Sequence, residues 1–157
     1  MIHNGNDDNL LILYSICAYY LDEGHDIRKY HLIMGSSVIR VMIVDDHPQV
    51  RRGLAVFLEL WDDFVFVGDA DNGEKAISLI EKLQPHVILM DLVMPVMDGV
   101  TATRIIHEKF PNIRIVVLTS TVELESIQHA LDAGAKSYML KNVTIDTMAE
   151  AIRTAMH

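Results

Sequence analysis

The sequence predicts an α/β domain in which helices cover both faces of a parallel β-sheet. Short apolar runs alternate with amphipathic segments from residue 38 onward in this chain of 157 residues. Strict alternation of strands and helices is typical of parallel sheets joined by right-handed crossovers. Residues 87–90 are apolar at every position, which favours a strand buried on both faces. Together these observations predict five β-α units.

The five units can be placed from their apolar patterns and from residues that begin or end helices. Pro48 fits the first turn of a helix, where its missing N–H is not needed, and Gly134 fits the position after a helix end. Pro111 and Asn112 end the third helix before the fourth strand. Strands are expected at residues 38–44, 64–67, 87–90, 113–118 and 137–140. Helices are expected at residues 48–60, 73–83, 99–110 and 122–133, and from residue 144 onward.

Composition and charge argue against several functional classes. Half of the residues are apolar, so the chain can form a packed core. The 13 Lys and Arg residues stand against 22 Asp and Glu residues, and this acidic balance argues against direct binding to nucleic acid. The single cysteine, Cys17, excludes an intramolecular disulfide and a cysteine-based zinc site. It also fits a reducing compartment, so we expect a cytoplasmic protein.

Residues 1–37 differ from the rest and are interpreted as an N-terminal extension. Residues 10–21 are apolar except for Ser15, but this run is shorter than the roughly 20 residues of a membrane span. No Lys or Arg precedes Arg28, so a signal peptide is not predicted either. The segment can be a disordered accessory tail, or a start placed upstream of Met34. The third interpretation is a short amphipathic helix that docks on this domain or on a partner.

Polar side chains follow four of the predicted strands. Asp45 and Asp46 follow the first strand, and Asp91 follows the third. Thr119 ends the fourth strand and Lys141 follows the fifth. Because functional groups of parallel sheets collect beyond the carboxyl ends of the strands, we expect these side chains to lie close together.

The residue types in this group predict a particular chemistry. Three carboxylates at one place repel one another, and a divalent cation relieves that repulsion. Carboxylate oxygens and waters are the ligands that Mg²⁺ prefers. A hydroxyl and an ammonium group can bind the oxygens of a transferring phosphoryl group, and a carboxylate can be its nucleophile. The group therefore predicts phosphorylation of an aspartate with the help of Mg²⁺.

The motifs that carry these residues resemble those of response-regulator receiver domains. The matching segments, in chain order, are Val44-Asp45-Asp46-His47, residues 90–99, Leu118-Thr119-Ser120 and residues 138–141. The resemblance covers about residues 38–157. It implies a flavodoxin-like (βα)5 three-layer sandwich with the strand order 2-1-3-4-5. Residues 46–48 and 138–141, together with Gly53, are further similar to NarL/LuxR-type regulators, in which a DNA-binding domain follows the receiver.

The resemblance implies roles around a metal ion. Asp91 would be the phosphoacceptor. Asp46 would bind Mg²⁺ (or Mn²⁺) directly, and Asp45 mainly through water. The backbone carbonyl of Val93 would complete the protein ligands. A departure from many receivers follows Lys141, where Asn142 replaces the usual proline and makes a cis peptide bond unfavourable.

The resemblance also implies a conformational switch. Thr119 and Lys141 would hold the phosphoryl oxygens, and Thr119 and Tyr138 would form the switch pair. A sensor histidine kinase would be the partner, with self-association or docking to an output domain as the response. Transcriptional regulation is expected, with the DNA-binding domain absent from this chain, or alternatively a stand-alone receiver. The protein would then be no enzyme beyond phosphorylating and dephosphorylating itself.

Other functions fit the sequence less well. A phosphatase with an aspartyl-phosphate intermediate would carry Asp-x-Asp after the first strand, where this chain has Asp45-Asp46-His47. A nucleotide or flavin module would carry a glycine-rich phosphate loop, which is absent. Asp45 and Asp46 taken alone could simply cap the first helix. The eight histidines show no ligand spacing, and His47 is given no ligand role.

Overall fold

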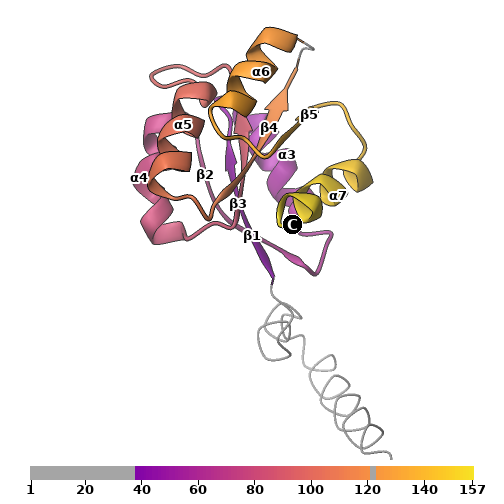
Figure 1. The fold of residues 1–157 in the computed structure, drawn as a ribbon. Helices are drawn as coiled ribbons and strands as arrows, with labels where there is room; N and C mark the ends of the chain where they lie inside the picture. The colour runs from indigo at the N-terminus through magenta and orange to yellow at the C-terminus, as the bar shows by residue number, and fades with distance from the viewer. Residues whose placement is uncertain (1–37, 121–122) are drawn as a thin grey trace, which may run out of the picture. The chain divides into compact units, whose positions relative to one another are not determined.

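The computed structural model describes residues 38–120 and 123–157, so every interpretation of residues 1–37 lies outside the described residues. In the described part, five parallel strands form one sheet in the order β2-β1-β3-β4-β5, as the resemblance implied (Figure 1). The strands are β1 (Ile39–Val44), β2 (Phe64–Ala70), β3 (Val87–Asp91), β4 (Arg114–Thr119) and β5 (Ser137–Leu140). The helices are α3 (Pro48–Leu58), α4 (Gly73–Leu83), α5 (Gly99–Lys109), α6 (Leu124–Asp132) and α7 (Ile145–Ala155).

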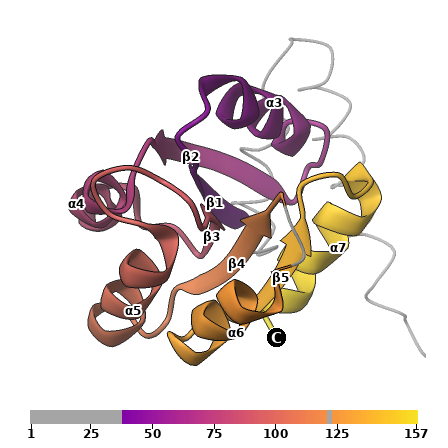
Figure 2. The same cartoon turned by 90° about the horizontal axis from the view of Figure 1, so that it is seen from above.

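The domain has three layers, with the sheet in the middle. Figure 2 shows α3 and α7 on one side of the sheet and α4, α5 and α6 on the other. The two faces of β1 supply two separate cores: Val41 and Ile43 pack with α3 and α7, whereas Met42 and Val44 pack with α4 and α5. All five residues of β3 are buried, which confirms the prediction of a strand covered on both faces. None of the described helices is long and apolar enough to cross a membrane.

Strand β2 runs further than the sequence pattern predicted, to Ala70 instead of residue 67. Its register against β1 shifts by one residue between Phe66 and Gly68, which leaves a β-bulge at Val67. Gly68 has a φ of 153°, a conformation that favours glycine, so the strand continues through it. The polar Asp69 that follows hid this extension from the apolar pattern, although it is paired with β1.

Helix α6 begins at Leu124, later than the predicted start at residue 122. Glu123 is the N-cap, and its extended backbone (φ −73°, ψ 97°) cannot belong to a helix. Residues 121 and 122 lie outside the described residues. The helix then ends at Asp132, before Gly134, whose φ of 110° confirms the predicted stop.

Arg153 fastens α7 to the turn that leads into β2. Its Nε and Nη2 donate to the two carboxylate oxygens of Asp63 at 2.7 and 3.0 Å. The guanidinium also lies over the rings of Trp61 and Phe64, 4.8 and 5.1 Å from their centroids. A planar, bidentate and stacked guanidinium of this kind cannot be replaced by a lysine ammonium.

We therefore expect Arg153→Met to lower the free energy of unfolding by about 1–2 kcal/mol, because it removes a paired and stacked cation. Arg153→Lys is expected to recover less than half of the loss. Urea unfolding followed by circular dichroism measures both, with Arg104→Met on the exposed side of α5 as the charge control. Equal losses for Arg153→Met and Arg104→Met would contradict the interpretation.

Candidate functional site

The carboxyl ends of β1, β3 and β5 bring three of the predicted residues into direct contact. The ammonium Nζ of Lys141 lies 2.5 Å from Oδ2 of Asp45 and 3.2 Å from Oδ1 of Asp91. The strands end in register, with Val44 of β1 beside Met90 of β3. The parallel sheet thus places residues that are 96 positions apart within hydrogen-bond distance.

The two carboxylates are buried, and Lys141 is their counter-charge. Asp45 is fully buried and Asp91 is 5% exposed, while the side chain of Lys141 is 18% exposed. Buried charges are tolerated when they are paired and hydrogen-bonded. One ammonium group therefore serves two buried carboxylates, and the cluster keeps a surplus of negative charge.

The pKa values of these groups follow from burial and pairing. Burial raises the pKa of the Asp91 carboxyl above its usual value; the positive charge of Lys141 opposes this shift, and the negative charge of Asp45 adds to it. Burial by itself lowers the pKa of Lys141, but its hydrogen bond to Asp45 and the charge of Asp91 outweigh that effect and raise it. Lys141 is therefore held in its charged form.

Asp46 and His47 extend the cluster toward solvent. The side chain of Asp46 is 30% exposed, but its Oδ1 is buried and has no hydrogen-bond partner of acceptable geometry. His47 Nδ1 lies 2.9 Å from that oxygen and 3.1 Å from Oδ1 of Asp45, with which it forms the hydrogen bond. One carboxylate oxygen is thus left unsatisfied next to other carboxylates.

This donor set fits a hard cation. Ligand atoms of Asp45, Asp46, His47 and Asp91 lie within 4.8 Å of one another. Oxygen ligands suit Mg²⁺, and an unsatisfied buried oxygen is a group that a cation would satisfy. No ligand role was predicted for His47; its position directly after the acidic pair was the only signal for its place in the cluster.

The helix-capping alternative for the acidic pair is wrong. Helix α3 begins at Pro48, and its N-cap is His47, which makes no side-chain capping hydrogen bond. Oδ1 of Asp45 accepts the backbone N–H of His47 at 2.8 Å, and its other oxygen binds Lys141. Asp45 is therefore turned toward the cluster at the end of the sheet.

The other predicted site residues differ in how exposed they are. Thr119 is 7% exposed at the end of β4, and its carbonyl accepts the backbone N–H of Lys141 at 2.9 Å. Tyr138 is 45% exposed on β5, so the ring is accessible at the surface. Val93 is 81% exposed in the loop after β3. The bond after Lys141 is not cis, since the described residues contain no cis peptide bond.

The loop after Asp91 is closed by Gly99. The backbone N–H of Gly99 donates to the carbonyl of Leu92 at 2.9 Å. A Cβ at this position would lie 2.0 Å from the carbonyl oxygen of Asp91, which is buried backbone. The same loop contains Val96 with a φ of 68°, an unusual conformation for a β-branched residue. The position of Asp91 thus depends on a glycine eight residues later.

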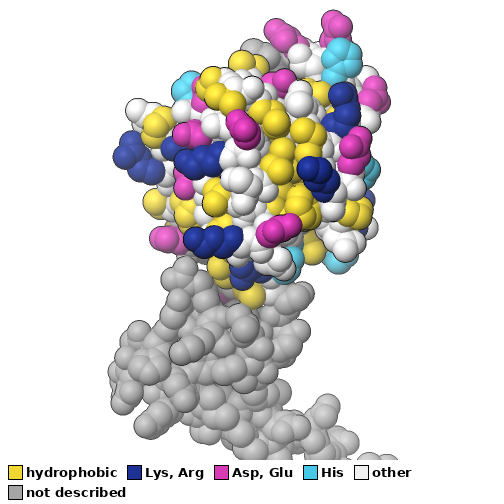
Figure 3. Space-filling view, turned by 90° about the vertical axis from the view of Figure 1, so that its left-hand side faces the viewer, with side chains coloured by type: hydrophobic (Ala, Val, Ile, Leu, Met, Phe, Trp, Pro, Cys, Tyr) yellow, Lys and Arg dark blue, Asp and Glu magenta, His cyan; other side chains and the backbone are white. Residues whose placement is uncertain are grey.

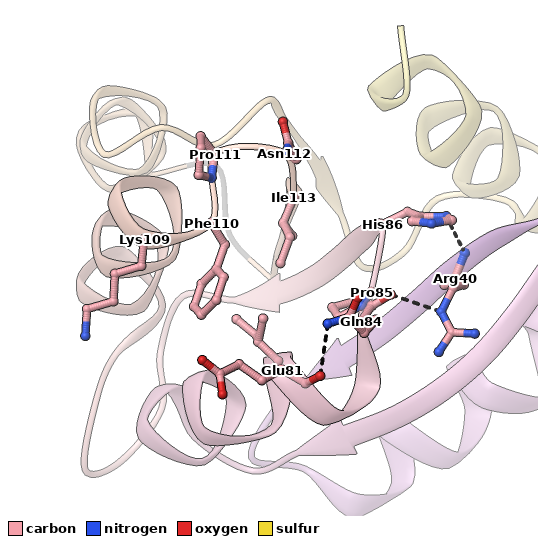
Figure 4. A pocket seen from close by; sticks show the side chains of 11 residues that line it. Arg40, Glu81, Gln84, Pro85, His86, Lys109, Phe110, Pro111, Asn112 and Ile113 are labelled. Carbon is pink, nitrogen blue, oxygen red and sulfur yellow. Dashed lines mark hydrogen bonds between the residues drawn. The ribbon is translucent and has the colours of Figure 1, made fainter.

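A pocket of about 600 Å³ lies away from this cluster, where β3 and β4 begin (Figure 4). Phe110 and Ile113 form part of its apolar wall. At its rim, the guanidinium of Arg40 donates to the carbonyls of Leu83 and Gln84 at 2.7 and 3.0 Å. These bonds satisfy the last carbonyls of α4. This arginine therefore has a structural role at the opposite end of the sheet from the acidic cluster.

The fold and the acidic cluster define a response regulator receiver domain. The chain belongs to that family, whose pattern matches residues 41–153. Receiver domains bind Mg²⁺ at an acidic pocket and generally act as phosphoacceptor switches, and the acidic residues of this chain form such a cluster.

Two curated relatives show which response regulators the chain is similar to. The chain is 44% identical over 118 residues to the transcriptional regulatory protein LiaR of Bacillus subtilis, covering 75% of this chain and 56% of that protein. It is 43% identical over 115 residues to the response regulator protein VraR of Staphylococcus aureus, covering 73% of this chain and 55% of that protein. The chain therefore spans about half the length of the curated relatives it matches.

Solved structures share the same fold. The signal receiver domain of the response regulator NarL from Mycobacterium tuberculosis superposes with a TM-score of 0.73 at 31% identity, covering 76% of this chain and 97% of that chain. The isolated REC domain of RcsB from Salmonella enterica, determined in the presence of the phosphomimetic BeF3-, superposes with a TM-score of 0.69 at 30% identity. That match covers 74% of this chain and 87% of that chain.

The contact at Gly99 leads to a first prediction for the site. Gly99→Ala is expected to lower the free energy of unfolding by about 1–3 kcal/mol or more, because the buried carbonyl of Asp91 must move. Gly53→Ala is the matched control: nothing lies within 4 Å of its Cβ position in α3, so it should stabilise by up to about 1 kcal/mol. Urea unfolding measures both, and equal effects of the two substitutions would contradict the close-approach argument.

Asp98 leads to a second prediction, on pH. Its carboxylate caps α5 by accepting the backbone N–H and the hydroxyl of Thr101 at 2.8 and 2.9 Å. Burial alone would raise the pKa of Asp98, but these hydrogen bonds outweigh it and lower the pKa. A lowered pKa in the folded state means that the carboxylate stabilises the fold near neutral pH. This contribution is lost as the pH falls through the folded-state pKa.

We expect Asp98→Ala to lower the free energy of unfolding by about 1 kcal/mol at pH 7. The gap to the wild type should narrow as the pH falls toward 3, because the protonated wild-type residue is a poorer cap. Asp98→Asn keeps an N-cap acceptor without titrating and should show a smaller, flatter gap. Urea titrations at several pH values measure these differences. A gap for Asp98→Ala that widens on acidification would disprove the assignment.

Proposed function

We propose that this chain is a phosphorylation-controlled switch in which Asp91 accepts a phosphoryl group from a sensor histidine kinase. The observation that supports this most directly is the cluster at the end of the sheet. A buried carboxylate at the end of β3 lies 3.2 Å from a protonated lysine and next to two further carboxylates. Buried carboxylates with a perturbed pKa, grouped with a fixed cation, are typical of sites that carry out chemistry.

In the transfer, a carboxylate oxygen of Asp91 attacks the phosphorus atom of the donor. A new bond forms between that oxygen and phosphorus, and the bond from phosphorus to the donor's nitrogen or oxygen breaks. The leaving group departs with the electron pair of that bond. Lys141, already charged beside Asp91, is placed to bind a phosphoryl oxygen, and Thr119 would offer its hydroxyl to another.

We propose that Asp45, Asp46, Asp91 and the backbone carbonyl of Val93 hold Mg²⁺, or Mn²⁺ in its place. The unsatisfied Oδ1 of Asp46 and the surplus of carboxylates over cations support this assignment. When bound, the ion neutralises negative charge on the phosphoryl oxygens. The protein's part is to hold the carboxylates close together in the absence of the ion, and Lys141 does this for Asp45 and Asp91.

Phosphorylation would be read out through β5. A phosphoryl group adds about −1.5 to −2 charge, and we propose that Thr119 moves toward it while the exposed ring of Tyr138 turns inward. This change would alter the face formed by α6, β5 and α7, and so self-association or docking to an output domain. Because the chain spans about half of LiaR and VraR, a transcriptional output belongs to the whole protein in this proposal; a stand-alone receiver is the alternative.

The domain itself is proposed to contact proteins, not nucleic acid or membrane. Figure 3 shows the side that carries α4 and α5, where basic, acidic and apolar side chains alternate without a continuous basic surface among the described residues. The net charge of the whole chain, −9, also argues against binding to nucleic acid. We propose a cytoplasmic protein that is the substrate of its kinase and catalyses no reaction beyond its own phosphorylation and dephosphorylation.

Intact-mass spectrometry tests the chemistry directly. The full chain is incubated with acetyl phosphate and Mg²⁺, beside an Asp91→Asn variant and a sample with EDTA in place of Mg²⁺. We expect one added phosphoryl group in the wild type and none in either control, because the nucleophile or the cation is missing. Lys141→Met should reduce the initial rate at which chains acquire the phosphoryl group by at least about tenfold, since it removes an electrostatic contact worth a few kcal/mol in the transition state.

An adduct that forms equally on Asp91→Asn would place the phosphoacceptor elsewhere and disprove the assignment. An adduct that forms equally in EDTA would remove the metal from the proposal. If the wild type shows no adduct while BeF3- in the presence of Mg²⁺ shifts the amide resonances around Asp91, the phosphorylated form is short-lived. If neither reagent has an effect on the folded protein, the proposed function is wrong.

A further inference from the structure

We infer that Arg51 is a positioning residue for the acidic pair: its guanidinium fixes the peptide between Asp45 and Asp46 and thereby orients Asp46 toward the cation. This inference rests on the proposed Mg²⁺ site and names a residue outside it on which that site depends. Arg51 lies in α3 and contributes no ligand atom to the acidic cluster.

Arg51 contacts the acidic pair through the backbone of Asp45. Nη1 of Arg51 donates to the carbonyl oxygen of Asp45 at 2.7 Å. That carbonyl and the N–H of Asp46 belong to one planar peptide unit. Holding the oxygen therefore fixes the plane from which the Cα and side chain of Asp46 depart. A shift of this peptide would displace the carboxylate of Asp46 relative to those of Asp45 and Asp91.

The guanidinium is itself held on its other side. Nε of Arg51 donates to Oδ2 of Asp69, which belongs to the part of β2 beyond the bulge. The backbone N–H of Arg51 donates to the carbonyl of His47 at 3.2 Å, and its side chain is 18% exposed. Arg51 is therefore fixed between a helix and a strand, and its planar group binds two acceptors at once.

The carboxylate of Asp46 is held by fewer hydrogen bonds than that of Asp45. Asp45 is held independently: its N–H donates to the carbonyl of Ala70 at 3.1 Å, and its carboxylate binds Lys141 and the N–H of His47. Oδ1 of Asp46, in contrast, makes no hydrogen bond; its neighbour at 2.9 Å is Nδ1 of the largely exposed His47, which is hydrogen-bonded to Asp45. The direction of this carboxylate is therefore set to a larger extent by the backbone that leads into it, and Arg51 holds that backbone.

The adjacent residue offers a matched control for charge. Arg52 follows Arg51 directly in α3 and is exposed. Substituting either arginine by methionine removes one positive charge near the cluster, but only Arg51 is bonded to the carbonyl of Asp45. Long-range attraction predicts similar effects for the two substitutions, whereas positioning predicts an effect of Arg51 alone.

The test is the dissociation constant of Mg²⁺, measured by isothermal titration calorimetry on the full, unphosphorylated chain. We expect Arg51→Met to weaken binding by about tenfold, as loss of a residue that orients metal ligands does. Arg52→Met should change binding by less than about twofold, because an exposed charge is screened. Arg51→Lys should lie between them, since an ammonium can reach the carbonyl but cannot also bind Asp69 in the same plane.

A second readout separates positioning from a loss of stability. In EDTA, the ¹⁵N–¹H resonances of Asp46 and His47 should shift in Arg51→Met and stay in place in Arg52→Met, while the resonances of α7 remain unchanged. If Arg51→Met does not fold, Asp69→Asn takes its place. It weakens the anchor of Arg51 and should reduce Mg²⁺ affinity by about threefold, below the full effect of a lost orienting residue.

The outcomes distinguish this inference from the proposed function. A wild type that binds no Mg²⁺ would overturn the metal site and the inference with it. A wild type that binds Mg²⁺, with Arg51→Met and Arg52→Met weakened equally, would overturn the inference alone. Tenfold weaker binding in Arg51→Met, with the resonance shifts confined to the acidic pair, would support it.

Discussion

The rest of the domain depends on one ammonium group placed between two buried carboxylates. Removing Lys141 would leave Asp45 and Asp91 as neighbouring buried negative charges, and breaking a buried pair of this kind costs about 3–5 kcal/mol. The three residues lie at the carboxyl ends of β1, β3 and β5, so the ion pairs of Lys141 also connect β5 with two strands that are not its neighbours in the sheet. The strand order places the two carboxylates at the ends of the inner strands β1 and β3, and the pairing with Lys141 offsets the free-energy cost of burying them.

Support for this cluster comes from backbone contacts more than from side chains. Gly99 lets the loop after β3 return to within touching distance of the carbonyl of Asp91, and Arg51 is bonded to the carbonyl of Asp45. The bond of Arg51 fixes the peptide that leads into Asp46, and the missing Cβ of Gly99 leaves room for the carbonyl of Asp91. For Asp46 such control has an advantage, because a side-chain hydrogen bond would use the carboxylate oxygen that a cation needs.

Much of this arrangement could be predicted from the sequence, for a physical reason. In a parallel sheet all strands end at one edge, so locating the strands was enough to bring Asp45, Asp91 and Lys141 together. The residues that support the cluster from outside, such as Arg51, could not be predicted in this way. The bond of Arg51 to Asp69 requires β2 to continue past Gly68, and a bulge followed by a polar residue leaves no apolar pattern. The start of α3 at Pro48 was predicted correctly, but the place of His47 in the cluster depends on the direction of its side chain, which a sequence pattern does not give.

The arrangement that stabilises the domain also makes it suitable for switching. Lys141 is shared between Asp45 and Asp91, so a phosphoryl group on Asp91 would compete with Asp45 for the same ammonium. A cation held by the acidic pair would offset the loss of that contact. The backbone of Lys141 is bonded to the carbonyl of Thr119, and Tyr138 lies three residues before it on the edge strand β5. A shift of the ammonium would therefore first affect β5, which is an edge strand of the sheet in the described part of the chain.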